Sequence, residues 1–495
     1  MDISVLVFLA SGLFLGWSLG ANDAANVFGT AVGTRMITFA TAAAICSVFV
    51  ILGAVVSGAG AAQTLGRLGT INALPGAFMA ALSAALAVYG MTKLGLSVST
   101  TQAIVGAIIG WNLFSGFPTD PGSFATLAAT WIACPILAAV ISVVLYTATL
   151  KLVRKAKLHL FRLDAYTRLA LILAGAFGAY SLGANNIANV MGVFVPANPF
   201  TTFRLEGLLT FSAREQLFLL GALAIAVGVI TYSKRVMLTV GSDLLPLSPV
   251  GAWVAVVAHS LVLFLFASEG LEFLLASAGL PTIPLVPVSS SQAVVGAVLG
   301  IGLVKGGRAI RWRVLGNLAS GWVTTPVISC AICFVSLFFL QNVFNQEVYR
   351  DRGYILSEAA LARLEARGLP RDPLADLEGF QFLGAADFRS KVAERVDLSV
   401  TQEQILLDTA EIVRIEVDPA LYPRLYRGTL SAAQIGAVTR LGPRSYRHRW
   451  AFFEDLARLS DDWLLRPETP LNKPHNRQVQ RDLDFVLAIF GTDPN

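Results

Sequence analysis

Ten apolar segments fill the first two-thirds of this chain, and they constrain its fold more than any other feature. A helix crosses the roughly 30 Å hydrocarbon core of a bilayer with about 20 residues, which is the typical length of these segments. They form two sets of five, at residues 4–33, 37–58, 72–91, 96–114 and 123–150, and then at 169–195, 215–232, 250–268, 284–304 and 314–341. The whole chain has a mean hydropathy of +0.65 and only 14% charged residues, so its apolar first two-thirds is not a soluble globular protein. The sequence predicts an all-α, multi-pass protein of the cell membrane.

The charges of the connecting loops test this count of segments. If the N-terminus lies outside, fourteen Lys and Arg residues fall at inner ends and three at outer ends, which is a strong positive-inside bias. The inner ones are Arg35, Lys93, Lys151, Arg154, Lys155, Lys157, Arg162, Arg168, Lys234, Arg235, Lys305, Arg308, Arg311 and Arg313, and the outer ones are Arg67, Arg204 and Arg214. Because each set has an odd number of spans, the second set enters the membrane upside down. We therefore expect an inverted-topology repeat of about 5+5 spans with broken helices or hairpins, its halves being residues 1–165 and 166–341.

One short signature occurs once in each half. The two copies are Gly20-Ala21-Asn22-Asp23-Ala24-Ala25-Asn26-Val27 and Gly183-Ala184-Asn185-Asn186-Ile187-Ala188-Asn189-Val190. An aspartate at the centre of a spanning helix costs about 2.5 to 3.5 kcal/mol to insert, so Asp23 is by default a functional-site hypothesis. The alternative is structural, because Gly and Ala allow close helix packing and Asn side chains bond between helices. The duplication favours a functional site, since internal repeats are typical of transporters.

A second pair of elements begins with three hydroxyl residues and a glutamine. The copies are Ser99-Thr100-Thr101-Gln102 and Ser289-Ser290-Ser291-Gln292, each followed by an apolar run with spaced glycines. This pattern predicts a helix that begins inside the membrane with hydroxyls at its cap. Such a helix start attracts anions, because free N–H groups and about half a positive charge lie there. The alternative is that the hydroxyls only cap their own helices.

Charge balance at such a site predicts symport. Two helix starts supply about one positive charge, whereas a phosphate group carries about 1.5 to 2 negative charges near neutral pH. Asp23 adds another negative charge if ionised, and the two pairs of elements contain no Lys or Arg. A dry site would therefore need cations that enter with the anion. Carboxylate and amide oxygens suit sodium, although a proton on Asp23 would serve a similar purpose.

Together these paired elements resemble the PiT family of inorganic phosphate transporters, which are cation-coupled symporters with inverted repeats. The resemblance covers about residues 1–341 and implies two sets of binding residues. The set for the coupling cation is Asn22, Asp23, Asn185 and Asn186, and the set for the substrate is Asn26, Asn189, Ser99, Thr100, Thr101, Gln102, Ser289, Ser290, Ser291 and Gln292. Asn186 stands where the family commonly has Asp, which leaves the identity and stoichiometry of the cation open. Gln102 and Gln292 stand where many relatives have His, which argues against a His-based proton relay.

The function predicted in this way is symport of inorganic phosphate by alternating access, coupled to sodium or a proton and with no other cofactor. Because PiT relatives include sulfate permeases, and arsenate mimics phosphate, one alternative is a proton-driven permease for sulfate or another oxyanion. A less favoured alternative is an anion channel, which would need basic residues that the paired elements lack. An enzyme is not expected, since none of His159, His259, His448 and His475 adjoins either pair of elements in the sequence. Membrane lipid is an expected partner and nucleic acid is not, and a homo-oligomer is left open.

Residues 342–495 have a different composition. They hold 20 Lys and Arg against 23 Asp and Glu, a net charge of −3, whereas residues 1–341 have a net charge of +8. Helices are predicted at residues 356–365 and 450–459. The length suits one soluble, mainly helical domain, to which the sequence assigns no role. The parity of the spans places it outside, beside the N-terminus.

Overall fold

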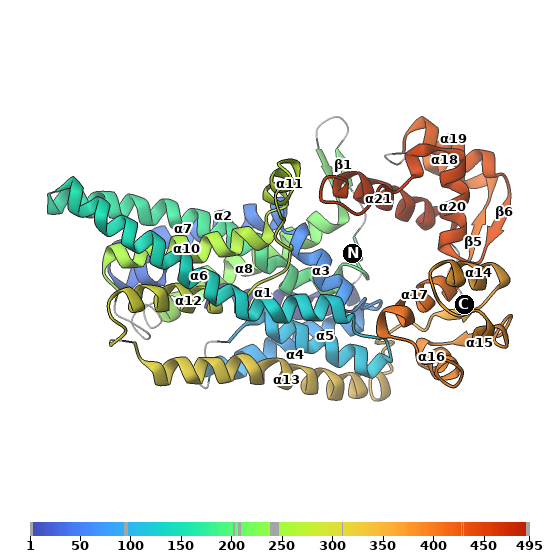
Figure 1. Cartoon of the computed structure of the whole chain (residues 1–495), viewed down its shortest axis with the longest axis horizontal. Coiled ribbons are helices and arrows are strands. Elements are labelled where there is room, and N and C mark those ends of the chain that lie inside the picture. The colour runs from blue at the N-terminus through green and yellow to red at the C-terminus, as the bar shows by residue number, and fades with distance from the viewer. Residues whose placement is uncertain are drawn as a thin grey trace. The chain divides into compact units, whose positions relative to one another are not determined.

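The computed structural model describes residues 3–93, 98–157, 159–200, 203–205, 209–237, 247–308, 310–426, 428 and 430–491 (Figure 1). The chain divides into two compact units. One comprises Met1–Leu271 and Ile283–Arg350, and we call it the membrane unit. The other comprises Glu272–Thr282 and Asp351–Asn495, and we call it the tail unit.

All ten predicted segments are helices, which confirms the all-α membrane fold. They are α1 (Ile3–Gly33), α2 (Phe39–Ser57), α4 (Leu74–Lys93), α5 (Thr100–Ser115), α6 (Pro121–Ala156), α7 (Leu160–Met191), α8 (Ala213–Thr231), α10 (Pro249–Ala267), α12 (Ser290–Val304) and α13 (Trp312–Asn342). Eight of the helices in the described chain are long and apolar enough to cross a membrane. The other two of these ten, α5 and α12, have 16 and 15 residues. Residues 96 and 97 of the predicted segment 96–114 lie outside the described residues.

Several short elements connect these helices. They are α3 (Ala59–Leu68), η1 (Gly192–Phe194), the antiparallel strands β1 (Phe203–Leu205) and β2 (Leu209–Phe211), and α11 (Glu269–Ser277). The sequence analysis predicted no helix at α3 or α11, which lie between the predicted apolar segments.

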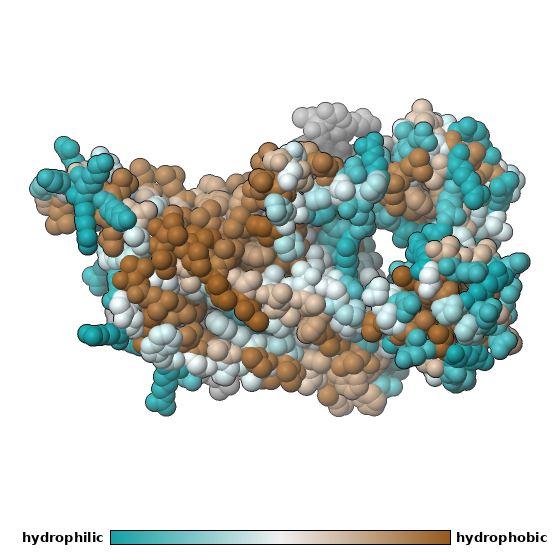
Figure 2. Space-filling model, viewed as in Figure 1, coloured by the Kyte–Doolittle hydropathy of each residue, from teal (hydrophilic) through white to brown (hydrophobic). Residues whose placement is uncertain are grey.

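The outer surface of the membrane unit is apolar. On α6, Ile132, Ile136, Val140 and Val144 are 55 to 68% exposed and follow one another at four-residue intervals, so they form a single outward stripe. Figure 2 shows such apolar surface over much of this unit. A continuous apolar face of this kind is stable against lipid rather than water.

Glycines let the helices of one half pack closely on those of the other. An added Cβ at Gly20 of α1 would lie 1.9 Å from the carbonyl oxygen of Ile225 on α8, and one at Gly183 of α7 would lie 2.1 Å from that of Val50 on α2. The same contact recurs between the short and the long helices. A Cβ at Gly106 of α5 would lie 2.1 Å from the Pro326 oxygen on α13, and one at Gly296 of α12 would lie 2.1 Å from the Pro135 oxygen on α6. Only glycine permits backbones to approach so closely.

The tail unit contains short helices and two small antiparallel sheets. The sheets pair β3 (Gly353–Ile355) with β4 (Gln381–Leu383) and β5 (Ile415–Val417) with β6 (Arg444–Tyr446). The helices are α14 (Glu358–Ala366), α15 (Asp372–Ala375), α16 (Ala385–Ala393), α17 (Val400–Ala410), α18 (Tyr422–Leu425), α19 (Ala432–Leu441), α20 (Arg449–Leu459) and α21 (Lys473–Phe490), with the 3₁₀ turns η2 (Pro419–Leu421) and η3 (Asp461–Trp463). The helices α14 and α20 confirm the two that the sequence predicted.

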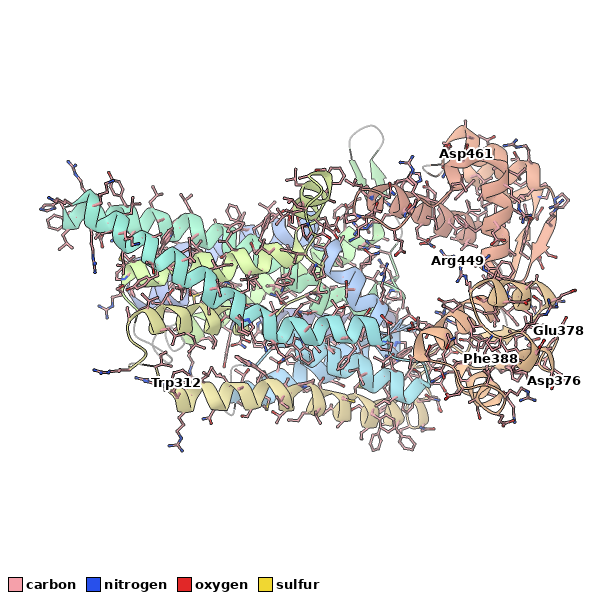
Figure 3. All side chains as sticks on the ribbon, viewed as in Figure 1. Trp312, Asp376, Glu378, Phe388, Arg449 and Asp461 are labelled. Carbon is pink, nitrogen blue, oxygen red and sulfur yellow. The ribbon has the colours of Figure 1, made fainter. Side chains whose placement is uncertain are left out.

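Two apolar clusters hold the tail unit together. Phe388 of α16 stacks on Tyr354 of β3 with ring centroids 5.2 Å apart, and Phe388 is labelled in Figure 3. Farther along the chain, Phe452, Trp463 and Phe490 are buried in a second cluster. Buried aromatic and aliphatic side chains of this kind stabilise a compact fold.

Candidate functional site

The structure brings the signature in each half into contact with a hydroxyl element. Asn26 of α1 donates from Nδ2 to Ser290 Oγ at 3.0 Å, and Asn189 of α7 donates from Nδ2 to Thr101 Oγ1 at 2.8 Å. Each bond joins one half of the chain to the other. All four side chains are buried. Residues separated by up to 264 positions in the sequence therefore form one polar cluster.

The two hydroxyl elements begin helices as predicted. Ser99 caps α5 by accepting from Gln102 N at 3.3 Å, and Ser289 caps α12 by accepting from Gln292 N at 3.2 Å. Residues 98–99 and 284–289, which lie directly before the two helices and include the caps, are not helical. The breaks in the helices thus lie before α5 and α12, whereas α1 and α7 continue as helices through their signatures. At both starts, first-turn N–H groups are free to face an anion.

The approaches to these two helices are bonded to the site and to each other. Asn185 clamps the backbone of Val288, donating to its carbonyl oxygen at 2.7 Å and accepting from its N–H at 3.0 Å. The hydroxyl of Thr101 donates to the same Val288 oxygen at 3.3 Å, and that of Ser291 donates to the Val98 oxygen at 3.5 Å. The start of α5 therefore contacts the start of α12, and α7 holds both.

Asp23 lies in α1 and is 4% exposed. Its carboxyl group forms no hydrogen bond or ion pair with a residue that the structure describes. No described Lys or Arg bonds to any residue of the paired elements. A buried carboxylate without a partner is costly, so a cation or a proton is the natural companion of Asp23.

Several other buried polar atoms of the cluster lack partners within the described chain. They are Thr100 Oγ1, Gln102 Oε1, Asn186 Nδ2, Asn189 Oδ1, Gln292 Oε1 and His259 Nδ1. Buried polar groups are normally hydrogen-bonded, so a concentration of unpaired donors and acceptors makes this cluster a candidate site for a polar ligand. Both types of atom are present, which suits an oxyanion and a cation with oxygen ligands.

The remaining predicted residues lie in the same elements with different contacts. Asn186 accepts from Asn189 Nδ2 at 2.9 Å, and Ser289 and Ser291 share a hydrogen bond of 3.1 Å. Asn22 is buried like Asp23, and no hydrogen bond links either side chain to the other predicted residues in the described structure. The structure thus connects most of the predicted set directly. Among the described residues it shows no side-chain hydrogen bond for Asn22, Asp23, Thr100, Gln102 and Gln292, which are buried in the elements that carry them.

One buried group of the site was missed by the sequence analysis. His259 of α10 is fully buried, and its Nε2 lies 3.0 Å from Ser290 Oγ. No histidine adjoins the paired elements in the sequence, but His259 contacts one of them in the folded chain. His259 lies 31 residues before Ser290, and no sequence repeat accompanies it.

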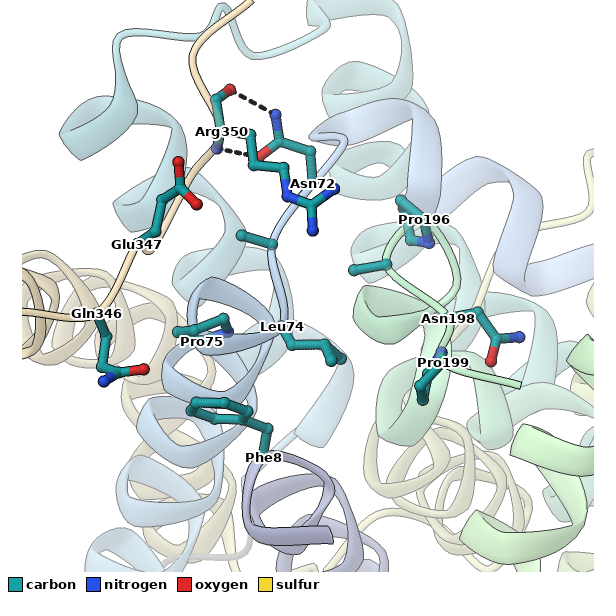
Figure 4. Close-up of a pocket in the computed structure, with 12 residues that line it drawn as sticks. Phe8, Asn72, Leu74, Pro75, Pro196, Asn198, Pro199, Gln346, Glu347 and Arg350 are labelled. Carbon is teal, nitrogen blue, oxygen red and sulfur yellow. Dashed lines mark hydrogen bonds between the residues drawn. The ribbon is translucent and has the colours of Figure 1, made fainter. Parts of the chain in front are cut away.

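A separate pocket of about 500 Å³ lies elsewhere in the membrane unit (Figure 4). Phe8, Pro75 and Pro199 are among its lining residues, and none of the lining residues belongs to the paired elements. Asn72 bonds to both backbone groups of Arg350 at its edge, at 2.9 and 3.0 Å. This pocket is distinct from the polar cluster.

The sequence of this chain matches a known protein family. Residues 19–333 match the phosphate transporter family. An inferred phosphate permease of Methanocaldococcus jannaschii is 29% identical over 336 residues, which cover 68% of this chain and 97% of that protein. Another, of Haemophilus influenzae, is 24% identical over 421 residues, which cover 68% and 96% of the two chains.

A solved structure has the same fold. It is described as the sodium-dependent phosphate transporter, and it covers 68% of this chain and 100% of its own with a TM-score of 0.51 and 24% identity. The matched region contains both signatures and both hydroxyl elements. This chain belongs to the phosphate transporter family, and it is a multi-pass transporter of phosphate in the cell membrane rather than an enzyme.

Proposed function

We propose that this protein is a symporter that couples phosphate uptake to sodium and works by alternating access. The observation that carries the proposal is the charge of the polar cluster. Asp23 is buried without a cationic partner among the described residues, and the paired elements contain no Lys or Arg. Two helix starts supply only about one positive charge, against about 1.5 to 2 negative charges on phosphate. Phosphate beside an ionised Asp23 would leave more than one negative charge uncompensated, and entering cations remove this deficit.

The ligand atoms favour sodium over a softer ion. Asp23, Asn22 and Asn186 offer carboxylate and amide oxygens, which are ligands for hard cations. Among the described residues, no group of three or more His, Cys, Asp or Glu could hold a transition metal. The sodium dependence stated for the structurally similar transporter supports the same choice.

The substrate would lie at the starts of α5 and α12. The hydroxyls of Thr100 and Ser290 and the free N–H groups there are donors for phosphate oxygens, and Gln102 and Gln292 offer amide groups in the first turn of each helix. The exchange of packing partners between halves, α1 with α8 and α7 with α2, supports two inverted repeats that rock against each other.

Uptake of labelled phosphate into proteoliposomes tests this proposal. We expect an inward sodium gradient to drive accumulation, a proton gradient alone to drive little, and excess sulfate not to compete. Accumulation that needs only a proton gradient, or that sulfate abolishes, would instead indicate the proton-driven oxyanion permease. Equal flux in both directions without any gradient coupling would indicate a channel.

A further inference from the structure

His259 is the one buried histidine of the described membrane unit that bonds to a hydroxyl of the site. Its Nε2 lies 3.0 Å from Ser290 Oγ, and the same oxygen accepts from Asn26 Nδ2 at 3.0 Å. Ser290 is the first residue of α12, so its hydroxyl lies at the helix start where the anion is expected. Two side chains from two other helices therefore fix one hydroxyl.

The hydrogen-bond inventory assigns the proton on this histidine. A serine oxygen has one proton and two lone pairs, and Asn26 occupies one lone pair. If Nε2 carries a proton, it occupies the second lone pair; if Nε2 is bare, Ser290 must donate to it. His259 Nδ1 has no partner in the described structure. A buried N–H without an acceptor is rarer and costlier than a bare acceptor, so the proton belongs on Nε2.

This arrangement leaves the Ser290 proton free. With both lone pairs occupied by Asn26 and His259, the hydroxyl can act only as a donor. A donor suits an oxyanion and cannot serve as a ligand of a cation. The neighbours of Ser290 thus decide which of the two transported ions it serves.

The corresponding hydroxyl in the first half of the chain is not fixed by two side chains in the described structure. The counterpart of Ser290 is Thr100, whose hydroxyl is buried with no partner among the described residues. When Gly76-Ala77-Phe78 is aligned with Gly251-Ala252-Trp253, the counterpart of His259 is Ala84. The two helix starts therefore differ at this position: two side chains fix the Ser290 hydroxyl, and none of the described ones fixes that of Thr100.

We propose that His259 is a positioning residue for phosphate, which acts by turning the Ser290 hydroxyl toward the anion. The proposal rests on the proposed binding of phosphate at the start of α12. It predicts that His259 affects the affinity for phosphate through Ser290 alone, and that it contributes little to the maximal rate.

A double-mutant cycle with substitutions of matched geometry tests this role. The KM for phosphate and the maximal rate are measured in proteoliposomes for His259→Leu, Ser290→Ala and the double variant, with His259→Gln and His259→Asn beside them. The amide nitrogen of Gln reaches the place of Nε2, whereas that of Asn reaches only the place of Nδ1. Ser260→Ala is the control, because the bond of Ser260 among the described residues is to Val256 O in its own helix, at 2.6 Å.

We expect His259→Leu and Ser290→Ala each to raise KM about 3- to 10-fold, the range of one lost hydrogen bond, with the maximal rate changed less than about twofold. The double variant should match Ser290→Ala, because the two residues act as one unit. His259→Gln should restore affinity, and His259→Asn should not. The proposal would be overturned if the KM increases of the two single variants multiplied in the double variant, or if Asn and Gln at position 259 restored the wild-type KM equally. If the Leu variant does not fold, the Gln and Asn variants still decide. Sodium independence of the wild type would refute the proposed coupling alone, since the cycle can be measured under whichever gradient drives uptake.

Discussion

The contact of Gly296 with α6 gives a prediction whose size follows from the structure. A Cβ at this position would lie 2.1 Å from the Pro135 oxygen, whereas a carbon and a carbonyl oxygen in contact are about 3.3 to 3.6 Å apart. Gly296→Ala therefore forces α12 and α6 apart by roughly 1 Å, and overpacking of this kind costs about 1 to 3 kcal/mol. Ser290 lies on the same helix and holds two bonds of 3.0 Å, so a shift of this size weakens them as well.

Gly316→Ala is the matched control. Gly316 lies inside α13, and a Cβ there would meet nothing within 4 Å. Both substitutions gain about 0.5 to 1 kcal/mol of helix propensity, so the comparison isolates the clash. We expect Gly296→Ala to lower the unfolding temperature in detergent and to raise the KM for phosphate uptake at least threefold, and Gly316→Ala to do neither. Equal stability and equal KM in the two variants would refute the close contact and its link to the site.

Three further outcomes are expected. Asp23→Asn should abolish cation-driven uptake in proteoliposomes, and wild-type rates in that variant would remove Asp23 from the coupling mechanism. Thr100→Ala should raise the KM for phosphate about 2- to 10-fold by removing one donor, and an unchanged KM would support capping alone. In the tail unit, burial raises the pKa of the Glu411 carboxyl above its ordinary value, although Arg352 lies 2.9 Å away. The stability that the protonated Glu411 provides is therefore fully present below the ordinary carboxyl pKa and is lost as the pH rises through the raised pKa. Because Gln stays neutral at every pH, Glu411→Gln should slow hydrogen exchange near β5 relative to the wild type at neutral pH and not at acidic pH.

Duplication explains why so much of the membrane unit was predictable. Each half repeats the same signals in the same order, so chance patterns could be set aside, and the starts of α5 and α12 follow directly from their cap residues Ser99 and Ser289. The sequence predicted that the signatures and the hydroxyl elements share one site, but not which side chains bond to each other. The pairing depends on side-chain direction in three dimensions: Asn26 bonds to Ser290, whereas its counterpart Asn189 bonds to Thr101, one position beyond the counterpart of Ser290.

The predicted site residues were found because they are repeated in the two halves, and His259 was missed because it is not repeated. It has no repeat copy, since Ala84 stands at the corresponding position, and a lone histidine in an apolar helix is more often a packing residue. The short helices α3 and α11 were missed because they have only 10 and 9 residues, too few for a span, and lie in the gaps between the predicted apolar segments. The strands of the tail unit are three residues long, too short for an alternating pattern to be recognised.

Helices of the first half pack on helices of the second half, and this has a consequence for how the protein is made. Gly20 contacts Ile225, and Gly106 contacts Pro326, in each case more than 200 residues later in the chain. A nascent chain that has inserted only its first five helices therefore holds open backbone surfaces with nothing to cover them. Maturation must wait until the second half leaves the ribosome, so a product truncated at the midpoint should be a substrate for membrane proteases rather than a stable half-protein.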